Sequence, residues 1–266
     1  MLTVFNNVIA IYQRELRGYF ASPLAYAIAG LFWLLGGFFL TVILLSPQGL
    51  IAQVAIADQF GGAGASIDVP YEFLKIYLSL LGSLSMFVLP ILSMGLYAEE
   101  RKQGTLELLA TSPITNWAVA LGKLLGVVTF YIGIVLPLMF CEAIALSTSD
   151  PPIQPIGMIL GHLGLILLAA SVLSLGMFVS SLTESTVLAA IMTFVLVLLL
   201  WVVDAIAEGL GGAWGEILSH LSLLTHYTDF TEGVLDTSGL LLFISYIVLG
   251  LFLTAQSIDA LRFQRS

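Results

Sequence analysis

Residues 156–204 read IGMILGHLGLILLAASVLSLGMFVSSLTESTVLAAIMTFVLVLLLWVVD. Two apolar runs, 156–180 and 186–204, are separated here by the polar turn from Ser181 to Ser185. A helix that crosses a membrane needs about 20 mainly apolar residues, and each run reaches or approaches that length. The stretch therefore predicts two membrane-spanning helices joined by a very short connection.

Four more apolar runs flank this pair, at residues 24–45, 75–97, 117–146 and 238–260. The 266 residues are 59% apolar and 9% charged, with a mean hydropathy of +1.06. A soluble domain is roughly 45–50% apolar and about 25% charged. This composition disfavours a disordered chain, a disulfide scaffold and a nucleic-acid-binding protein. The predicted fold is an all-α polytopic membrane protein with six transmembrane helices, formed by one membrane domain over residues 1–266.

Residues 1–22 are too polar to span a membrane, and their apolar residues recur at helical spacing. Arg14 and Arg17 fall on the polar side of the predicted helix. Such a helix is expected to lie flat in the headgroup region. The alternative is a soluble helix packed on a partner.

The basic residues indicate the orientation of the chain. With six spans they fall on one side, which the positive-inside rule assigns to the cytoplasm; they are Arg14, Arg17, Arg101, Lys102, Lys123, Arg262 and Arg265. The sequence thus predicts a multi-pass protein of the cell inner (plasma) membrane with both termini in the cytoplasm. Lys75 falls on the opposite side, where Glu72 is expected to pair with it along a helix.

The predicted external loops are of two kinds. Residues 46–72 contain the Gly-rich stretch 61–64 and are interpreted as a flexible excursion. Residues 205–237 hold apolar stretches too short to span, which indicate short external helices before the sixth span.

The main cytoplasmic feature is the segment 97–117, YAEERKQGTLELLATSPITNW. Gly104 is expected to end the preceding helix, and Thr105 to cap a short helix that runs to Ala110. Glu107 suits its first turn, and Pro113 stops it. Its leucines either lie back on the membrane or dock a soluble cytoplasmic partner.

Within this region the stretch from Glu99 to Lys123, EERKQGTLELLATSPITNWAVALGK, resembles the cytoplasmic coupling region of ABC-2 type transporter permeases. The stretches from Arg14 to Phe32 and from His226 to Arg265 are similar to the branch of gliding-motility (Gld) and copper-enzyme-maturation (Nos) permeases. The resemblance implies a dimer of permease subunits, either homodimer or heterodimer, with two copies of a cytoplasmic ATPase subunit bound inside.

The resemblance also implies that the short coupling helix contacts the ATPase. The residues expected at this contact are Glu99, Glu100, Gly104, Thr105, Leu106, Glu107, Leu108, Leu109, Thr111 and Pro113. The sequence has no phosphate-binding loop, because Gly122-Lys123 is followed by Leu124. We therefore expect ATP and Mg²⁺ on the partner ATPase, and no catalytic, cofactor-binding or metal-binding residue on this chain.

Several other residues allow more than one interpretation. The pairs Gly122/Gly126 and Gly157/Gly161 favour close helix packing. Glu142 and His162 are expected at the headgroup level in contact with water, or else paired with each other. His220 and His226 are assigned to a solvated loop rather than to a metal site.

The leading hypothesis is the permease subunit of an ATP-driven exporter, with the lipid bilayer, the ATPase, a second permease and an external or membrane accessory protein as partners. The alternative is a membrane anchor that transmits ATPase work to an external protein without moving a substrate. A stand-alone secondary transporter would need charged residues at the bilayer centre, where these spans carry almost none.

Overall fold

The computed structural model describes residues 2–59, 68–106, 115–149, 154–210 and 220–263, together with residues 152, 212 and 215. The described part of the chain contains helices and no strand. The helices are α1 (Leu2–Ala21), α2 (Pro23–Leu45), α3 (Leu50–Gln59), α4 (Val69–Ser93), α5 (Gly95–Lys102), α7 (Asn116–Ala145), α8 (Pro155–Leu182), α9 (Thr186–Leu210), α11 (Leu223–Thr231) and α12 (Thr237–Phe263).

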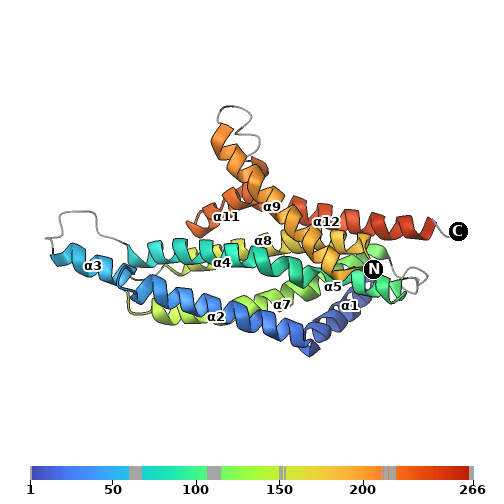
Figure 1. The fold of residues 1–266 in the computed structure, drawn as a ribbon, viewed down its shortest axis with the longest axis horizontal. Helices are drawn as coiled ribbons and strands as arrows, with labels where there is room; N and C mark the ends of the chain where they lie inside the picture. Colours follow the sequence, from blue (N-terminus) through green and yellow to red (C-terminus); the bar gives the residue numbers. More distant parts are fainter. Residues whose placement is uncertain are drawn as a thin grey trace.

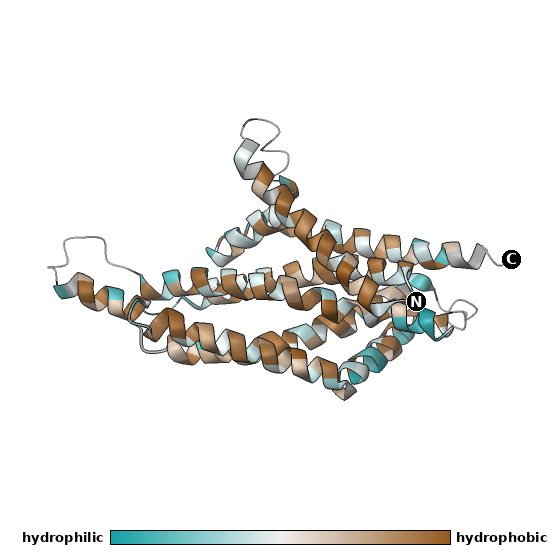
Figure 2. Cartoon of the chain, viewed as in Figure 1, coloured by the Kyte–Doolittle hydropathy of each residue, from teal (hydrophilic) through white to brown (hydrophobic). Residues whose placement is uncertain are grey.

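Six helical segments are long and apolar enough to cross a membrane. They are Pro23–Ala57, Val69–Lys102, Asn116–Ala145, Pro155–Leu182, Thr186–Val203 and Thr237–Ala260. Five of them, in α2, α4, α7, α8 and α12, follow the long axis of the molecule, whereas α9 leaves this bundle at a steep angle (Figure 1). The long flanks are apolar, and hydrophilic residues gather on α1 and α5 (Figure 2). The predicted all-α polytopic fold with six candidate spans is confirmed. The flexible excursion predicted for 46–72 is wrong in part, since α3 lies within it.

Local sequence explains where several helices begin. The Ser22 hydroxyl accepts a hydrogen bond from the Ala25 amide at 3.4 Å, and Pro23 occupies the first turn of α2. The Asp68 carboxylate accepts one from the Tyr71 amide at 3.1 Å at the start of α4. Both arrangements satisfy an amide that the first helical turn leaves without an intrahelical partner.

The core of the bundle is α8, which packs against α4, α7, α9, α11 and α12. Small residues on α8 permit these close approaches: a Cβ added to Gly164 would lie 2.5 Å from the Phe230 side chain. Ser171 and Ser174 donate hydrogen bonds to carbonyls of α12, those of Phe243 and Tyr246, each at 3.2 Å. Small residues and hydroxyls of this kind hold helices together in lipid, where apolar burial gives little driving force.

Helix α1 turns sharply into α2 and packs on α7 of the same chain (Figure 1). Phe5 and Phe20 are nevertheless 64% and 52% exposed. The helix thus presents one face to α7 and a second, apolar face to its surroundings. The prediction of a helix that simply lies in the headgroup region was incomplete, because it missed the packing on α7.

Candidate functional site

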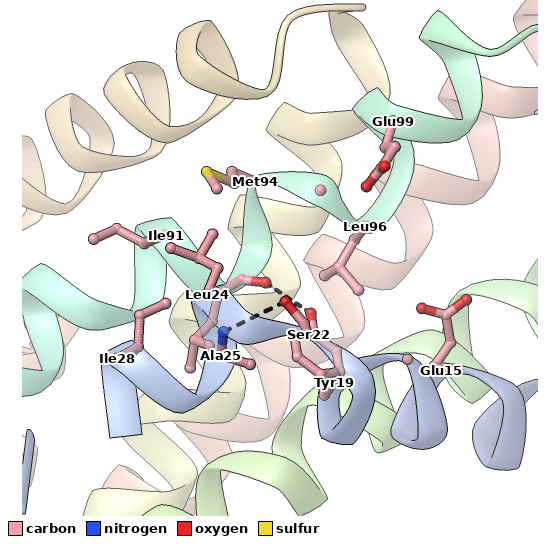
Figure 3. A pocket seen from close by; sticks show the side chains of 13 residues that line it. Glu15, Tyr19, Ser22, Leu24, Ala25, Ile28, Ile91, Met94, Leu96 and Glu99 are labelled. Atoms are coloured by element: carbon pink, nitrogen blue, oxygen red, sulfur yellow. Dashed lines mark hydrogen bonds between the residues drawn. The ribbon is translucent and has the colours of Figure 1, made fainter. Parts of the chain in front are cut away.

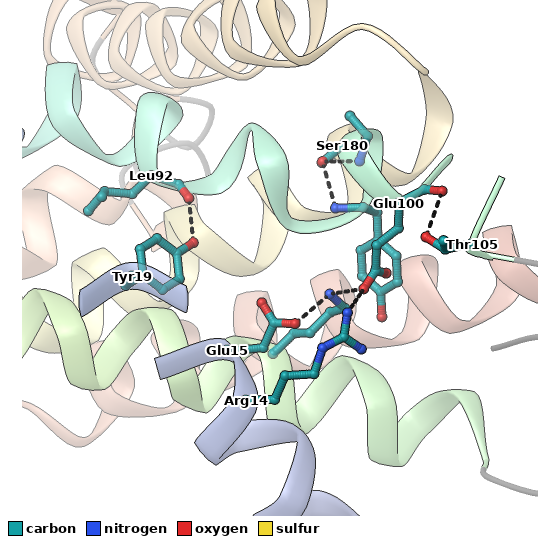
Figure 4. Close-up of polar contacts among 10 residues, drawn as sticks. Arg14, Glu15, Tyr19, Leu92, Glu100, Thr105 and Ser180 are labelled. Atoms are coloured by element: carbon teal, nitrogen blue, oxygen red, sulfur yellow. Dashed lines mark hydrogen bonds and ion pairs between the residues drawn. The ribbon is translucent and has the colours of Figure 1, made fainter. Parts of the chain in front are cut away.

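Four charged side chains meet where α1, α5 and α7 come together (Figure 4). The Lys123 ammonium lies 2.9 Å from Glu15 Oε1 and 3.0 Å from Glu100 Oε1. Arg14 Nη2 lies 3.4 Å from the same Glu100 oxygen. We call Arg14, Glu15, Glu100 and Lys123 the charge cluster. Its two cations balance its two anions.

Burial makes the pairing within the charge cluster necessary. The Lys123 side chain is only 3% exposed, and those of Glu100 and Glu15 are 11% and 16% exposed. Charges removed from water are tolerated only when they are paired and hydrogen-bonded. The Tyr97 ring, whose centroid lies 5.0 Å from Lys123 Nζ, adds a cation–π contact.

An interruption of the helix at Met94, between α4 and α5, places α5 for this contact. Ser180, near the end of α8, accepts hydrogen bonds from the amides of Tyr97 and Ala98 at 3.1 and 3.0 Å and donates one to the Met94 carbonyl at 2.7 Å. One buried hydroxyl thus satisfies backbone groups that the break leaves free. At the other end of α5, Arg101 donates to the Ser181 carbonyl at 2.8 Å.

Gly104 ends α5 with a φ of +70°, a conformation that glycine adopts without strain. The Thr105 amide and hydroxyl then both donate to the Glu100 carbonyl, at 3.0 and 3.2 Å. Thr105 therefore uses its hydroxyl to fasten the end of α5. The residues of the short helix that we expected it to cap lie outside the described part of the chain.

Apart from the half-buried Thr105, the predicted ATPase-coupling residues divide into three groups. Glu99 and Gly104 are exposed. Glu100 is buried in the charge cluster and Leu106 is 5% exposed within the core, so both side chains face the interior of this chain. Glu107, Leu108, Leu109, Thr111 and Pro113 lie outside the described residues.

The role of Lys123 was missed, because the sequence placed it only as a positive charge at the start of a span. Its acidic partners Glu15 and Glu100 are 108 and 23 residues away in the chain. Its position within an apolar run could have indicated an acidic partner, because a lysine inside a membrane span needs a counter-charge.

A cavity of about 260 Å³ lies beside the charge cluster, between the α1–α2 turn and the α4–α5 break (Figure 3). Glu15 and Glu99 form its polar side, and Ile28 and Ile91 its apolar side. Tyr19 donates to the Leu92 carbonyl at 2.7 Å. Burial and the nearby Glu15 raise the pKa of Tyr19 above its usual range, which keeps this donor protonated.

The predicted helix-packing glycines behave differently from one another. A Cβ added to Gly122 would lie 2.9 Å from Ile11, and one added to Gly126 2.8 Å from Glu15 Cβ, so both lie directly under α1. A Cβ on Gly161 would collide with Leu78. Gly157 has no described atom within 4 Å of its own added Cβ, but its Cα lies 3.6 Å from a Cβ added to Gly233, just after α11.

Two predictions for the opposite end of the bundle are corrected. Lys75 pairs with Glu232 at 2.7 Å rather than with Glu72.

Glu142 and His162 are 0% and 3% exposed, and not open to water at the headgroup level. Their Oε2 and Nε2 atoms lie 3.2 Å apart, without hydrogen-bond alignment, so the alternative expectation that the two side chains pair with each other is confirmed.

The histidines before the last span also differ from each other. His220 is exposed, whereas His226 is 6% exposed and faces Asp229 and Asp236. The assignment of His226 to a solvated loop is therefore wrong. Hydrogen bonds from the Ser238 hydroxyl and amide hold the pKa of Asp236 below its usual value.

A family of known proteins matches part of this sequence. The family model described as "ABC-2 family transporter protein" matches residues 69–207, slightly more than half of the chain. The matched region runs from the start of α4 almost to the end of α9, and so includes α5, α7 and α8. No individual curated protein matches the sequence.

Proposed function

Because the chain belongs to the ABC-2 family of transporter proteins, we propose that it is an exporter permease driven through residues 99–113. A member of this family is a multi-pass membrane subunit of an ABC transporter, and ATP is hydrolysed in a separate subunit. The point at which the ATPase acts is our proposal from the arrangement around the charge cluster, and export is our proposal from the resemblance of residues 99–123 to ABC-2 type permeases.

The observation that carries the proposal is that both flanks of the segment 107–114 are anchored in the bundle. On one side Glu100 binds Lys123, and Arg101 binds the Ser181 carbonyl. On the other side Asn116 donates through its side-chain Nδ2 to the carboxylate Oδ1 of Asp259 in α12, at 2.6 Å. A push on the segment is therefore carried into α1, α7, α8 and α12 together.

This anchoring supports a mechanical role for the charge cluster. We propose that closure of the ATPase presses on the segment 107–114 and that α5 passes the displacement to α7 through Glu100 and Lys123. Packed helices shift between discrete arrangements rather than bending continuously. The two permease subunits, with two ATPase copies beneath them, then rock against each other as rigid bodies.

The charge distribution supports the orientation. The first turn of α1 and the last turn of α12 lie at the same end of the bundle as α5 (Figure 1). Arg14, Arg17, Arg101 and Lys102 lie on α1 and α5. By the positive-inside rule we propose that this end is cytoplasmic in the inner (plasma) membrane. The resemblance of 14–32 and 226–265 to the Gld and Nos permeases supports that branch, with an external accessory protein as a further partner.

Substitution in the segment tests the proposal. We expect Glu107→Lys or Leu108→Lys to weaken capture of the co-expressed ATPase in a pull-down and to uncouple transport from ATP hydrolysis, because a long cation replaces an acidic or apolar contact. Gln59→Lys, an equally large change at the exposed end of α3, is the matched control. Undiminished ATPase capture by both segment variants would refute the proposed coupling contact.

The membrane-anchor alternative makes a different prediction in reconstituted vesicles. An exporter moves its substrate in proportion to ATP turnover, whereas an anchor hydrolyses ATP through its partner without net flux. Measurement of flux against ATP turnover in the same vesicles separates the two functions.

A further inference from the structure

A second group of ionisable side chains lies near the start of α4, far along the bundle from the charge cluster. It forms where the end of α11 meets the start of α12. His226 Nδ1 lies 3.7 Å from Asp229 Oδ2 and 3.9 Å from Asp236 Oδ2. One donor atom from each of the three residues lies within 4.8 Å of the other two.

The imidazole is the unusual member of this group. His226 is only 6% exposed, and its Nδ1 atom has no hydrogen-bond partner among the described residues. A buried polar atom without a partner is costly. This one faces two carboxylates whose side chains are 42% and 43% exposed, so an ion can reach it from solvent.

The donor set fits a transition-metal ion. Imidazole nitrogen and carboxylate oxygen are both ligands of Zn²⁺, and a site with three protein ligands keeps a fourth position for water. Zinc bonds of about 2.0–2.2 Å place tetrahedral donors roughly 3.3–3.5 Å apart. The distances from Nδ1 are within half an ångström of that range, which small rotations of the two exposed carboxylates can close.

We propose that His226, Asp229 and Asp236 bind one divalent transition-metal ion, for which Zn²⁺ is the best match. The surroundings support the site. Ser238 hydrogen-bonds to both oxygens of Asp236 and orients it. Gly239 leaves room for the imidazole, since a Cβ there would lie 3.2 Å from Nδ1. Such outer partners fix the orientation of ligands in metal sites.

An ion at this position would fasten α11 to α12. Helix α11 is itself anchored in the bundle, because the Tyr227 hydroxyl donates to the Leu78 carbonyl at 2.5 Å and Phe230 packs on Gly164. The metal would thus join the last span to a helix that packs on α4 and α8. This role does not depend on ATP coupling.

Metal titration of the intact chain tests the proposal. The protein, freed of any histidine tag and stripped of metal, is titrated with Zn²⁺ against a chromophoric chelator. We expect saturable binding of one ion per chain and a rise in the thermal unfolding temperature. His226→Ala and Asp229→Asn should each weaken binding at least tenfold. His220→Ala, which removes the exposed histidine, should leave it unchanged.

Thermal unfolding without metal separates lost binding from lost folding. His226→Ala and Asp229→Asn should unfold close to the wild-type temperature in chelator and should lack only the shift that Zn²⁺ produces. If His226→Ala does not fold, the Zn²⁺ affinity of Asp229→Asn alone decides whether the three residues bind the ion. Absence of saturable binding by the wild-type chain, or wild-type affinity in Asp229→Asn, would overturn the proposal.

Discussion

Lys123 combines a full positive charge with nearly complete burial, and its two carboxylate partners come from different helices. Removal of one partner from a buried ion pair leaves an uncompensated charge, which costs more than the pair itself contributes. Lys123 therefore holds α1 and α5 against α7 through its ion pairs with Glu15 and Glu100. The pairing joins positions 108 and 23 residues apart.

The burial of Lys123 gives a prediction for the stability of the protein. Lys123→Met leaves Glu15 and Glu100 without their shared cation and should destabilise the protein by about 3–5 kcal/mol. Addition of Glu100→Gln and Glu15→Gln to the same chain should recover part of that loss. The measurement is denaturant unfolding of the purified protein in detergent. Lys102→Met, which removes an exposed lysine, is the control and should have little effect. Equal stability of the two lysine variants would rule out the charge cluster as a stabilising element.

The bounds of a membrane-spanning helix were predictable from the sequence where the length of an apolar run alone determines them. The run 117–146 became α7 (Asn116–Ala145), because an apolar stretch of that length has no soluble alternative. The packing of α1 on α7 was not predictable in the same way. Gly122 and Gly126 indicated a close approach, but their spacing does not specify which helix approaches.

The same limit applies to ionisable residues. For Lys75 the sequence offers only local information, which predicts an ion pair with Glu72, the nearest acidic residue at helical spacing. In the structure Lys75 instead pairs with Glu232, which is distant from it in the sequence. Pairs between distant segments depend on the packing of whole helices, which a periodic pattern does not encode.

Packing of α1 gives a prediction for a single element. Gly126→Leu introduces a side chain where only 2.8 Å separates an added Cβ from Glu15, so α1 must move away from α7. Overpacking of this kind costs about 1–3 kcal/mol, and here it also pulls Glu15 from Lys123. We expect faster proteolysis within α1 and reduced ATP-coupled activity. Gly133→Leu on the same helix, which meets no described atom within 4 Å, is the matched control. Equal proteolysis of the two variants would contradict the close packing of α1.

Across the whole molecule, the structure separates two regions along the α4–α5 axis. Lys75 in the second turn of α4 lies beside Glu232, and Glu100 in the last turn of α5 lies in the charge cluster. One end carries the anchored segment through which we propose that the ATPase acts. The other carries the α11–α12 junction with its proposed metal site. Helices α4 and α8 pack together along this axis, and we propose that they carry motion from one end to the other.

Site-directed labelling at position 107 tests the proposed coupling most directly. Glu107→Cys, made in a chain with Cys141→Ser, is treated in one sample with a membrane-impermeant thiol reagent and, in a separate unlabelled sample, with a bifunctional cross-linker in the presence of the ATPase. We predict no labelling in intact cells, labelling in inside-out vesicles, and a cross-link to the ATPase that suppresses ATP-driven transport. Labelling of position 107 from outside intact cells would contradict both the orientation and the coupling role.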